Sequence, residues 1–154
     1  MAFFHKGKLI KSATILGFGK SGRAVFEYLT KSYPHLPVSI RLQETRADLP
    51  EGVRIFTGEN LFSDFYEDLV FVSPSIRRDR RELSGKLLSS DAELFFEISR
   101  HKIFAVTGSD GKSTTTSLAG LLLGDGARAI GNLRAHRTLT GRPFHRKRPA
   151  SRFP

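Results

Sequence analysis

Short apolar runs alternate with stretches of helical periodicity between residues 13 and 123. The apolar runs are predicted strands and cover Ala13–Phe18, Pro37–Glu44, Val53–Thr57, Leu69–Ser73 and Lys102–Thr107. The stretches with helical spacing are predicted helices and cover Ser21–Ser32, Arg80–Leu88, Ser90–Arg100 and Lys112–Leu123. Strands that alternate with helices are typical of a parallel sheet with helices on its faces, so the pattern predicts an α/β fold.

The predicted helices are not equally well supported. Ser90 is a predicted N-cap with Glu93 as its partner in a capping box, which favours the helix over 90–100. Gly85 interrupts the segment 80–88 and makes it the weaker candidate. In the first helix, the residues expected to face the sheet are Ala24, Val25, Tyr28 and Leu29.

The first of two glycine-rich turns is Gly17–Gly22, with the spacing G-x-G-x-x-G. It follows a predicted strand and opens a predicted helix, where glycines let the backbone approach a phosphate and free N–H groups point at it. Glu44 lies 22 residues further on, where a dinucleotide-binding acid would contact a ribose. By itself the motif indicates either a dinucleotide site or a tight turn without a ligand.

The second turn runs from Thr107 to Thr114 and also joins an apolar strand to a helix. Backbone N–H groups would surround phosphates, Lys112 would reach the terminal phosphates, and the Ser113 hydroxyl would bind Mg²⁺. The general P-loop pattern places a glycine where this chain has Val106, so the loop is the shorter G-x-x-G-K-S. The alternative is a solvated turn before a Thr-rich helix.

Composition restricts the function classes. The sequence has no Cys, which excludes disulfides and fits a reducing cytoplasm. No apolar run approaches the roughly 18 residues of a membrane span, and the N-terminus lacks the apolar core of a secretory signal. We therefore expect a cytoplasmic protein without a membrane partner. The five His share no ligand spacing and are expected at the surface or in the tail.

The net charge of +10 is concentrated at the C-terminal end. Residues 133–154 hold seven of the 25 Lys and Arg and none of the 15 Asp and Glu. This tail has three Pro and no hydrophobic period, so it is predicted to be disordered. A run of arginines at 77–81 is interpreted as a solvated loop, with phosphate contact as the alternative.

The second turn, T-G-S-D-G-K-S-T-T, resembles the ATP-binding loop of the Mur ligases, which add amino acids to the peptidoglycan precursor. Other stretches follow in family order, and over residues 10–132 the order favours the D-glutamate-adding member. They are the turn at 17–22, Ser73–Ile76, Asp91–Phe95 and Gly131-Asn132. The resemblance implies a Rossmann-like UDP-binding domain over 1–100 and the truncated start of a P-loop ATP-binding domain over 101–132.

The resemblance also implies a role for each site residue. The UDP group would contact Lys20, Ser21, Thr45, Arg46, Ser73 and Asn132. ATP would be held by Gly108, Ser109, Asp110, Gly111, Lys112, Ser113 and Thr114. Lys112 and Ser113 would be catalytic, Ser113 through Mg²⁺. In the family reaction, ATP phosphorylates the carboxylate of UDP-N-acetylmuramoyl-L-alanine, and the amine of D-glutamate then attacks the acyl phosphate.

The chain departs from the family pattern in two places. Ser75 stands where the family loop usually has Gly. After Asn132, Leu133-Arg134 replaces an apolar-Gly pair, and no counterpart of the later Mg²⁺ ligands or of the amino-acid domain follows. We therefore expect a truncated monomer that is inactive alone, with a poorly stable segment 101–132. We interpret 133–154 as the product of a reading-frame change, with a selected basic arm as the alternative.

Two hypotheses from other classes stay open. A fragment of an NAD(P)-binding oxidoreductase would use the turn at 17–22 together with Glu44. It would have no need for a second phosphate loop around Lys112. A nucleic-acid-binding module would use the basic tail, but basic and aromatic residues are not interleaved in a folded domain.

Overall fold

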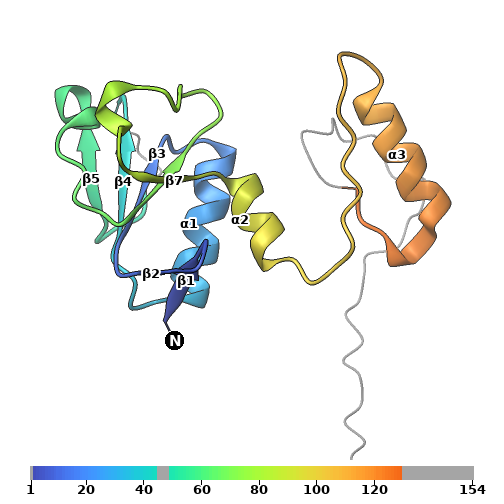
Figure 1. Cartoon of the computed structure of the whole chain (residues 1–154), viewed down its shortest axis with the longest axis horizontal. Helices are drawn as coiled ribbons and strands as arrows, with labels where there is room; N and C mark the ends of the chain where they lie inside the picture. Colours follow the sequence, from blue (N-terminus) through green and yellow to red (C-terminus); the bar gives the residue numbers. More distant parts are fainter. Residues whose placement is uncertain (1, 45–48, 130–154) are drawn as a thin grey trace, which may run out of the picture. The chain divides into compact units, whose positions relative to one another are not determined.

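The computed structural model describes residues 2–44 and 49–129 and divides into two compact units, the first ending at Ile103 and the second beginning at Phe104. The first unit is built on a parallel five-stranded sheet of order β5-β4-β3-β6-β7 (Figure 1). Its strands are β3 (Ala13–Leu16), β4 (Val38–Leu42), β5 (Arg54–Thr57), β6 (Leu69–Val72) and β7 (Leu87–Ser89). This confirms the α/β parallel sheet that the pattern predicted and the Rossmann-like fold that the resemblance implied. The chain leaves β3 in one direction and returns on its other side, so the strand order reverses between β3 and β6.

Helix α1 (Lys20–Ser32) covers one face of the sheet and contacts helix α2 (Asp91–Ile98). Buried side chains of both helices and of the sheet form one apolar cluster there. Val25 and Leu29 of α1 are buried as predicted, and Tyr28 packs against the cluster. Ala24 is exposed, because the helix buries a narrower stripe than expected.

The opposite face is covered by two short 3₁₀ helices, η1 (Gly58–Phe62) and η2 (Arg81–Leu83). A second apolar cluster lies beneath them and includes Leu16, Leu61 and Leu83. The helix predicted over 80–88 is wrong. Gly85 adopts a left-handed φ of 73°, which ends η2, and Leu87 pairs with Leu69 of β6 to extend the sheet.

An N-terminal hairpin, β1 (Phe3–His5) and β2 (Lys8–Ile10), was not predicted from the pattern. Lys6 and Gly7 form its turn with φ values of 49° and 74°, as a two-residue hairpin turn requires. His5 is fully buried, which corrects the expected surface position. The alternation of side chains in β1 places His5 on the same face as buried Phe3, and its ring also lies against Phe71.

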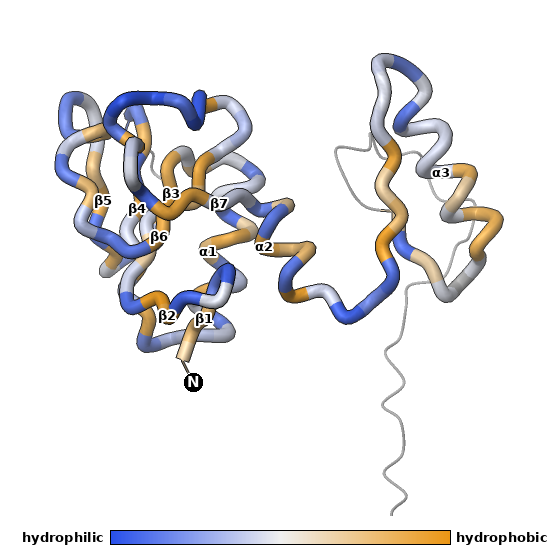
Figure 2. The backbone as a smooth tube through the Cα atoms, in the orientation of Figure 1, coloured by the Kyte–Doolittle hydropathy of each residue, from blue (hydrophilic) through white to orange (hydrophobic). Residues whose placement is uncertain are grey.

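The second unit contains α3 (Lys112–Leu123), at the predicted bounds, and the short η3 (Gly124–Gly126). The strand predicted over Lys102–Thr107 is wrong. A β-strand requires backbone hydrogen bonds to a neighbouring strand. The described part of this unit contains no extended segment that pairs with residues 102–107. Figure 2 shows the apolar character of this stretch, where Phe104 is 76% exposed. Leu122 of α3 is likewise 87% exposed, so the unit buries little apolar surface of its own.

None of the helices in residues 2–44 and 49–129 is long and apolar enough to cross a membrane.

Candidate nucleotide sites

The loops that follow β3 and β6 meet at the carboxyl edge of the sheet, at the point where the strand order reverses. The Gly17 N–H donates to the Arg41 carbonyl at 2.7 Å, and the Ser73 N–H donates to the Leu16 carbonyl at 2.9 Å. The Ile76 N–H donates to the Ser73 carbonyl at 2.9 Å and closes the second loop. In open parallel sheets this crevice is where ligands bind.

The three glycines of the first turn have different surroundings. Gly17 has a left-handed φ of 92°, and a Cβ placed on it would lie 2.6 Å from the Ser73 Cβ. A Cβ on Gly22 would lie 2.2 Å from the Gly17 carbonyl oxygen. A Cβ on Gly19 would meet no described atom within 4 Å, and its φ of −82° is open to any residue. Packing within the chain thus requires Gly17 and Gly22 but not Gly19.

Helix α1 begins at Lys20 with Gly19 as its N-cap, and no side chain bonds the cap. Its first turn contains no acidic residue. The N–H groups of a helix start have no partner within the helix, and the helix dipole is positive at this end. The end of α1 is therefore suited to an anionic group, next to exposed Lys20 and half-buried Ser21.

Some predicted UDP contacts can be located and others cannot. Lys20, Ser21 and Ser73 all follow the carboxyl ends of β3 and β6 and so lie at one edge of the sheet. Thr45, Arg46 and Asn132 lie outside the described residues. Ser75, in the place of the family glycine, is exposed with its hydroxyl 3.3 Å from that of Ser73.

A small cavity of about 220 Å³ adjoins the first turn and was not predicted. It is lined by Phe18, Arg23, Phe26, Glu27, Leu49 and Pro50. The Arg23 guanidinium lies over the Phe18 ring, 4.9 Å from its centre. Sites for whole drug-sized ligands occupy roughly 300–1,000 Å³, so this cavity suits only part of a nucleotide. Phe18 belongs to the glycine motif, but no local signal indicated that Leu49 and Pro50 would lie beside it.

Three of the four arginines after β6 are paired with carboxylates, among them Arg80 with Glu82. Arg77 bonds Asp79 at 2.6 Å, and Arg78 bonds Glu93 at 2.5 Å. The hydrogen bond from Arg78, aided by Lys6, lowers the pKa of Glu93 to about 2. Because three of these charges are already matched and all four side chains are exposed, the arrangement supports the interpretation as a solvated loop.

One of the two hydrogen bonds of the predicted capping box at α2 is formed. The Ser90 hydroxyl accepts a hydrogen bond from the Glu93 N–H at 3.2 Å, as predicted. The reciprocal bond is not made, because the Glu93 carboxylate bonds Arg78 and Lys6 instead.

The second glycine turn is exposed throughout. Gly111 is the N-cap of α3 with a left-handed φ of 74°, and no side chain bonds the cap. The Lys112 ammonium folds back over the loop and donates to the carbonyls of Gly108 and of Ser109, the latter at 2.8 Å. The loop thus offers uncapped helix amides and a lysine above them, a donor set that fits phosphate groups.

Magnesium has a limited set of protein ligands here. The described residues contain no group of three or more His, Asp or Glu side chains that could hold a metal ion. Ser113, at the exposed start of α3, offers one hydroxyl. That donor set fits an ion held mostly by nucleotide phosphates and water, as Mg²⁺ commonly is.

No family model matches the chain. Over 127 residues it is 33% identical to a protein of Clostridium botulinum strain Hall, a match that covers 70% of this chain and 26% of the relative. Over 123 residues it is 34% identical to a protein of Clostridium acetobutylicum, with the same coverage of both chains. The chain therefore spans 26% of the length of these curated relatives.

The parallel sheet and these matches make the chain a relative of the Mur ligases, over an N-terminal portion of them. Both relatives are named UDP-N-acetylmuramoylalanine–D-glutamate ligase. The resemblance that the motifs indicated is thereby confirmed.

Proposed function

We propose that the chain contributes the UDP-binding domain and the ATP loop of a ligase that adds D-glutamate to UDP-N-acetylmuramoyl-L-alanine. The domains would be 1–100 for UDP and 101–132 for the start of the ATP-binding domain. The names and identity of the relatives support the ligase class. The two glycine turns, each opening an uncapped helix, support the two nucleotide sites.

The observation that carries the UDP site is the open position of Gly19. Gly17 and Gly22 are explained by close contacts within the turn, but no described atom approaches the face of Gly19 where a Cβ would stand. A glycine at an ordinary φ with open space beside it lets a ligand approach the backbone closely. The diphosphate would lie there, bonded by the first amides of α1, with Lys20 as its counter-charge and Ser21 and Ser73 as hydroxyl partners.

In the proposed reaction, a carboxylate oxygen of the UDP substrate attacks the γ-phosphorus of ATP, and ADP leaves with the electrons of the broken P–O bond. The amine of D-glutamate then attacks the acyl carbon, loses a proton and expels phosphate, which leaves an amide. Lys112 would neutralise charge on the moving phosphoryl group. Its present bonds to the Gly108 and Ser109 carbonyls would have to be exchanged for bonds to phosphate. Mg²⁺ bound near Ser113 would supply further charge neutralisation.

The position of Glu44 supports one alternative function, that of an NAD(P)-binding oxidoreductase. Glu44 is exposed just beyond the end of β4, where a ribose-binding acid would stand. The names of the relatives favour UDP.

The test compares UDP and NAD by calorimetric titration of the wild-type chain and of Gly19→Ala. We expect UDP to bind more tightly than NAD. A methyl group at position 19 would block one backbone contact, so UDP affinity should fall about tenfold, the contribution of one hydrogen bond.

Gly126→Ala is the matched control, because Gly126 also has open space and an ordinary φ but lies in the second unit. It should bind UDP as the wild type does. Tighter binding of NAD, or unchanged UDP affinity in Gly19→Ala, would contradict the proposal.

A further inference from the structure

A charged pair is buried in the sheet on the face opposite α1. Arg41, near the carboxyl end of β4, is 0% exposed, and Glu67, just before β6, is 4% exposed. Parallel strands covered on both faces are normally apolar. A buried ion pair commonly contributes no more stability than apolar residues of the same volume. A contribution to stability therefore does not explain why a charged pair, and not apolar residues, lies here.

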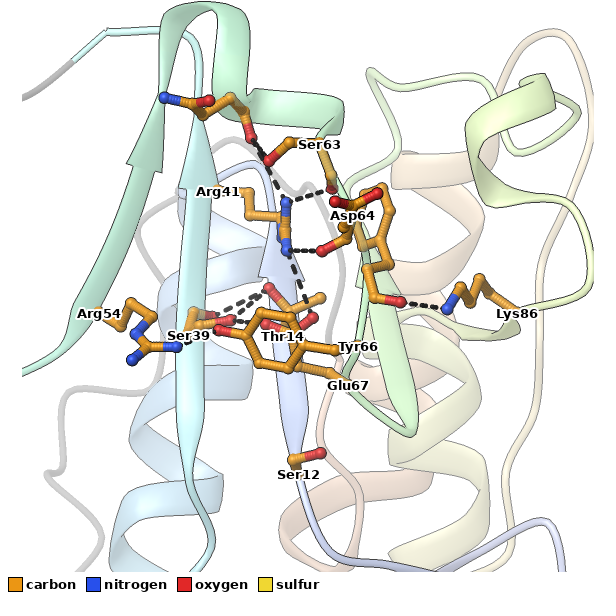
Figure 3. Close-up of polar contacts among 12 residues, drawn as sticks. Ser12, Thr14, Ser39, Arg41, Arg54, Ser63, Asp64, Tyr66, Glu67 and Lys86 are labelled. Carbon is orange, nitrogen blue, oxygen red and sulfur yellow. Dashed lines mark hydrogen bonds and ion pairs between the residues drawn. The ribbon is translucent and has the colours of Figure 1, made fainter.

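The Arg41 guanidinium binds the backbone carbonyls of the loop that precedes β6. One terminal nitrogen donates to the Ser63 carbonyl at 2.9 Å, and the other donates to the Asp64 carbonyl at 3.1 Å and to Glu67 at 3.4 Å. The rings of Phe56 and Phe65 lie over the guanidinium, 4.1 and 4.2 Å from its carbon. Figure 3 shows the guanidinium directed at the Ser63 and Asp64 backbone. An apolar side chain could fill the same space but could not bond these carbonyls.

The network continues across the sheet through hydroxyl groups. The Ser39 hydroxyl donates to the Glu67 carboxylate, and the hydroxyls of Ser39 and Thr14 are hydrogen-bonded at 2.7 Å (Figure 3). Thr14 lies on β3, and Ser39 lies two residues before Arg41 on β4. The alternation of side chains along each strand puts all of these groups on one face. The charged pair thus links β3, β4 and the loop before β6.

The backbone of Arg41 is also hydrogen-bonded to the glycine turn at the carboxyl edge of the sheet. Its carbonyl accepts the 2.7 Å hydrogen bond from the Gly17 N–H, the first amide of the glycine turn. Two residues later, the Gln43 carbonyl accepts a hydrogen bond from the Gly58 N–H at 3.2 Å. The end of β4 is therefore bonded to the turn on one side and to the loop after β5 on the other.

We propose that Arg41 is a positioning residue for the proposed UDP site. Its side chain bonds β4 to the loop at 60–64, which fixes the end of β4. Its carbonyl, held in place in this way, orients the Gly17 turn through the hydrogen bond from the Gly17 N–H. Glu67 holds the guanidinium in this orientation. The inference rests on the proposed function, because the ligand of the turn is taken to be UDP.

The test uses the double variant Arg41→Met with Glu67→Leu in the full chain, which removes both charges and keeps an apolar interior. Three measurements are made: the thermal transition, the Kd for UDP, and amide exchange at Gly17. We expect a retained cooperative transition, a Kd raised about tenfold or more, and faster exchange at Gly17 through loss of an ordered hydrogen bond. A purely structural role would move the transition alone.

Arg54→Met is the matched control. Arg54 is exposed on the neighbouring strand β5 and bonds the Tyr66 hydroxyl at 2.7 Å, with its guanidinium 5.8 Å from that ring. Strand β4 separates β5 from β3 and the Gly17 turn, so all three measurements should stay as in the wild type.

Unchanged UDP affinity and unchanged Gly17 exchange in a folded double variant would overturn the proposal. If the double variant does not fold, Arg41→Lys decides on the same measurements, because lysine keeps the charge but lacks the fork that bonds several carbonyls at once. If the wild-type chain binds no UDP, the proposed function fails, and Gly17 exchange alone then decides whether Arg41 positions the turn.

Discussion

Replacing Gly22 by alanine tests whether the glycine turn is fixed by contacts within the chain. The new Cβ would lie 2.2 Å from the Gly17 carbonyl oxygen and 3.1 Å from Cγ2 of Ile15. The oxygen belongs to the backbone of the turn, so it cannot move aside as a flexible side chain would. Overpacking typically costs 1–3 kcal/mol, and the backbone clash favours the upper end, about 3 kcal/mol.

Alanine also returns about 1 kcal/mol, because it is the better helix former and Gly22 lies in the first turn of α1. The free energy of unfolding should therefore fall by about 2 kcal/mol, and Tm should fall by roughly 8–16 °C for a unit of this size. Urea unfolding followed by circular dichroism measures the first quantity, and a thermal scan measures the second.

Gly19→Ala is the control for this prediction. It should change the free energy of unfolding by less than about 1 kcal/mol, since the weaker N-cap and the stiffer unfolded chain act in opposite directions. The reasoning about the turn is refuted if Gly22→Ala unfolds within about 0.5 kcal/mol of the wild type, a change typical of neutral surface substitutions. Equal losses in both variants would refute it as well.

Further predictions concern the core and the second unit. Burial lowers the pKa of His5 below 6.5, so the stability it contributes is complete above pH 6.5 and is lost as pH falls through the lowered pKa. Urea midpoints of His5→Leu should therefore vary less than wild-type midpoints below pH 6.5, and equal slopes would contradict this. Arg41→Met alone should lower the free energy of unfolding by about 3–5 kcal/mol, because Glu67 stays buried without its partner. A smaller loss of unfolding free energy in Arg41→Met than in the double variant would contradict this. Ser90→Ala should cost about 1 kcal/mol through loss of the α2 cap, whereas an unchanged urea midpoint would deny the cap any role. Amide protons of 112–123 should exchange much faster than those of the sheet, since the leucines of α3 are exposed, and strong protection in a monomer would show that this unit is covered.

Much of the candidate site could be read from the sequence, because its determinants are local. The strand, glycine turn and helix around Gly17–Gly22 follow one another along the chain, and the structure places β3 and α1 within two residues of the predicted bounds. The helix after Lys112 was predicted for the same reason. Ser73 was assigned through the family resemblance of the Ser73–Ile76 loop, which is again a local signal. What the sequence did not reveal was the cavity beside Phe18, which brings α1 together with Leu49 and Pro50.

The sequence by itself thus determined the class of fold and the two glycine-rich turns that open helices, since hydrophobic period and glycine spacing act over a few residues. Tertiary structure decided the features that depend on distant partners. Leu87–Ser89 became a strand because β6 offers it a ladder, while the apolar stretch after Lys102 formed none because no described strand pairs with it. His5 is buried only because a hairpin places it against Phe71. Arg41 and Glu67 lie 26 residues apart, and nothing local indicates that their charges meet. Burial and pairing are properties of the folded sheet, because they arise from contacts that local periodicity does not encode.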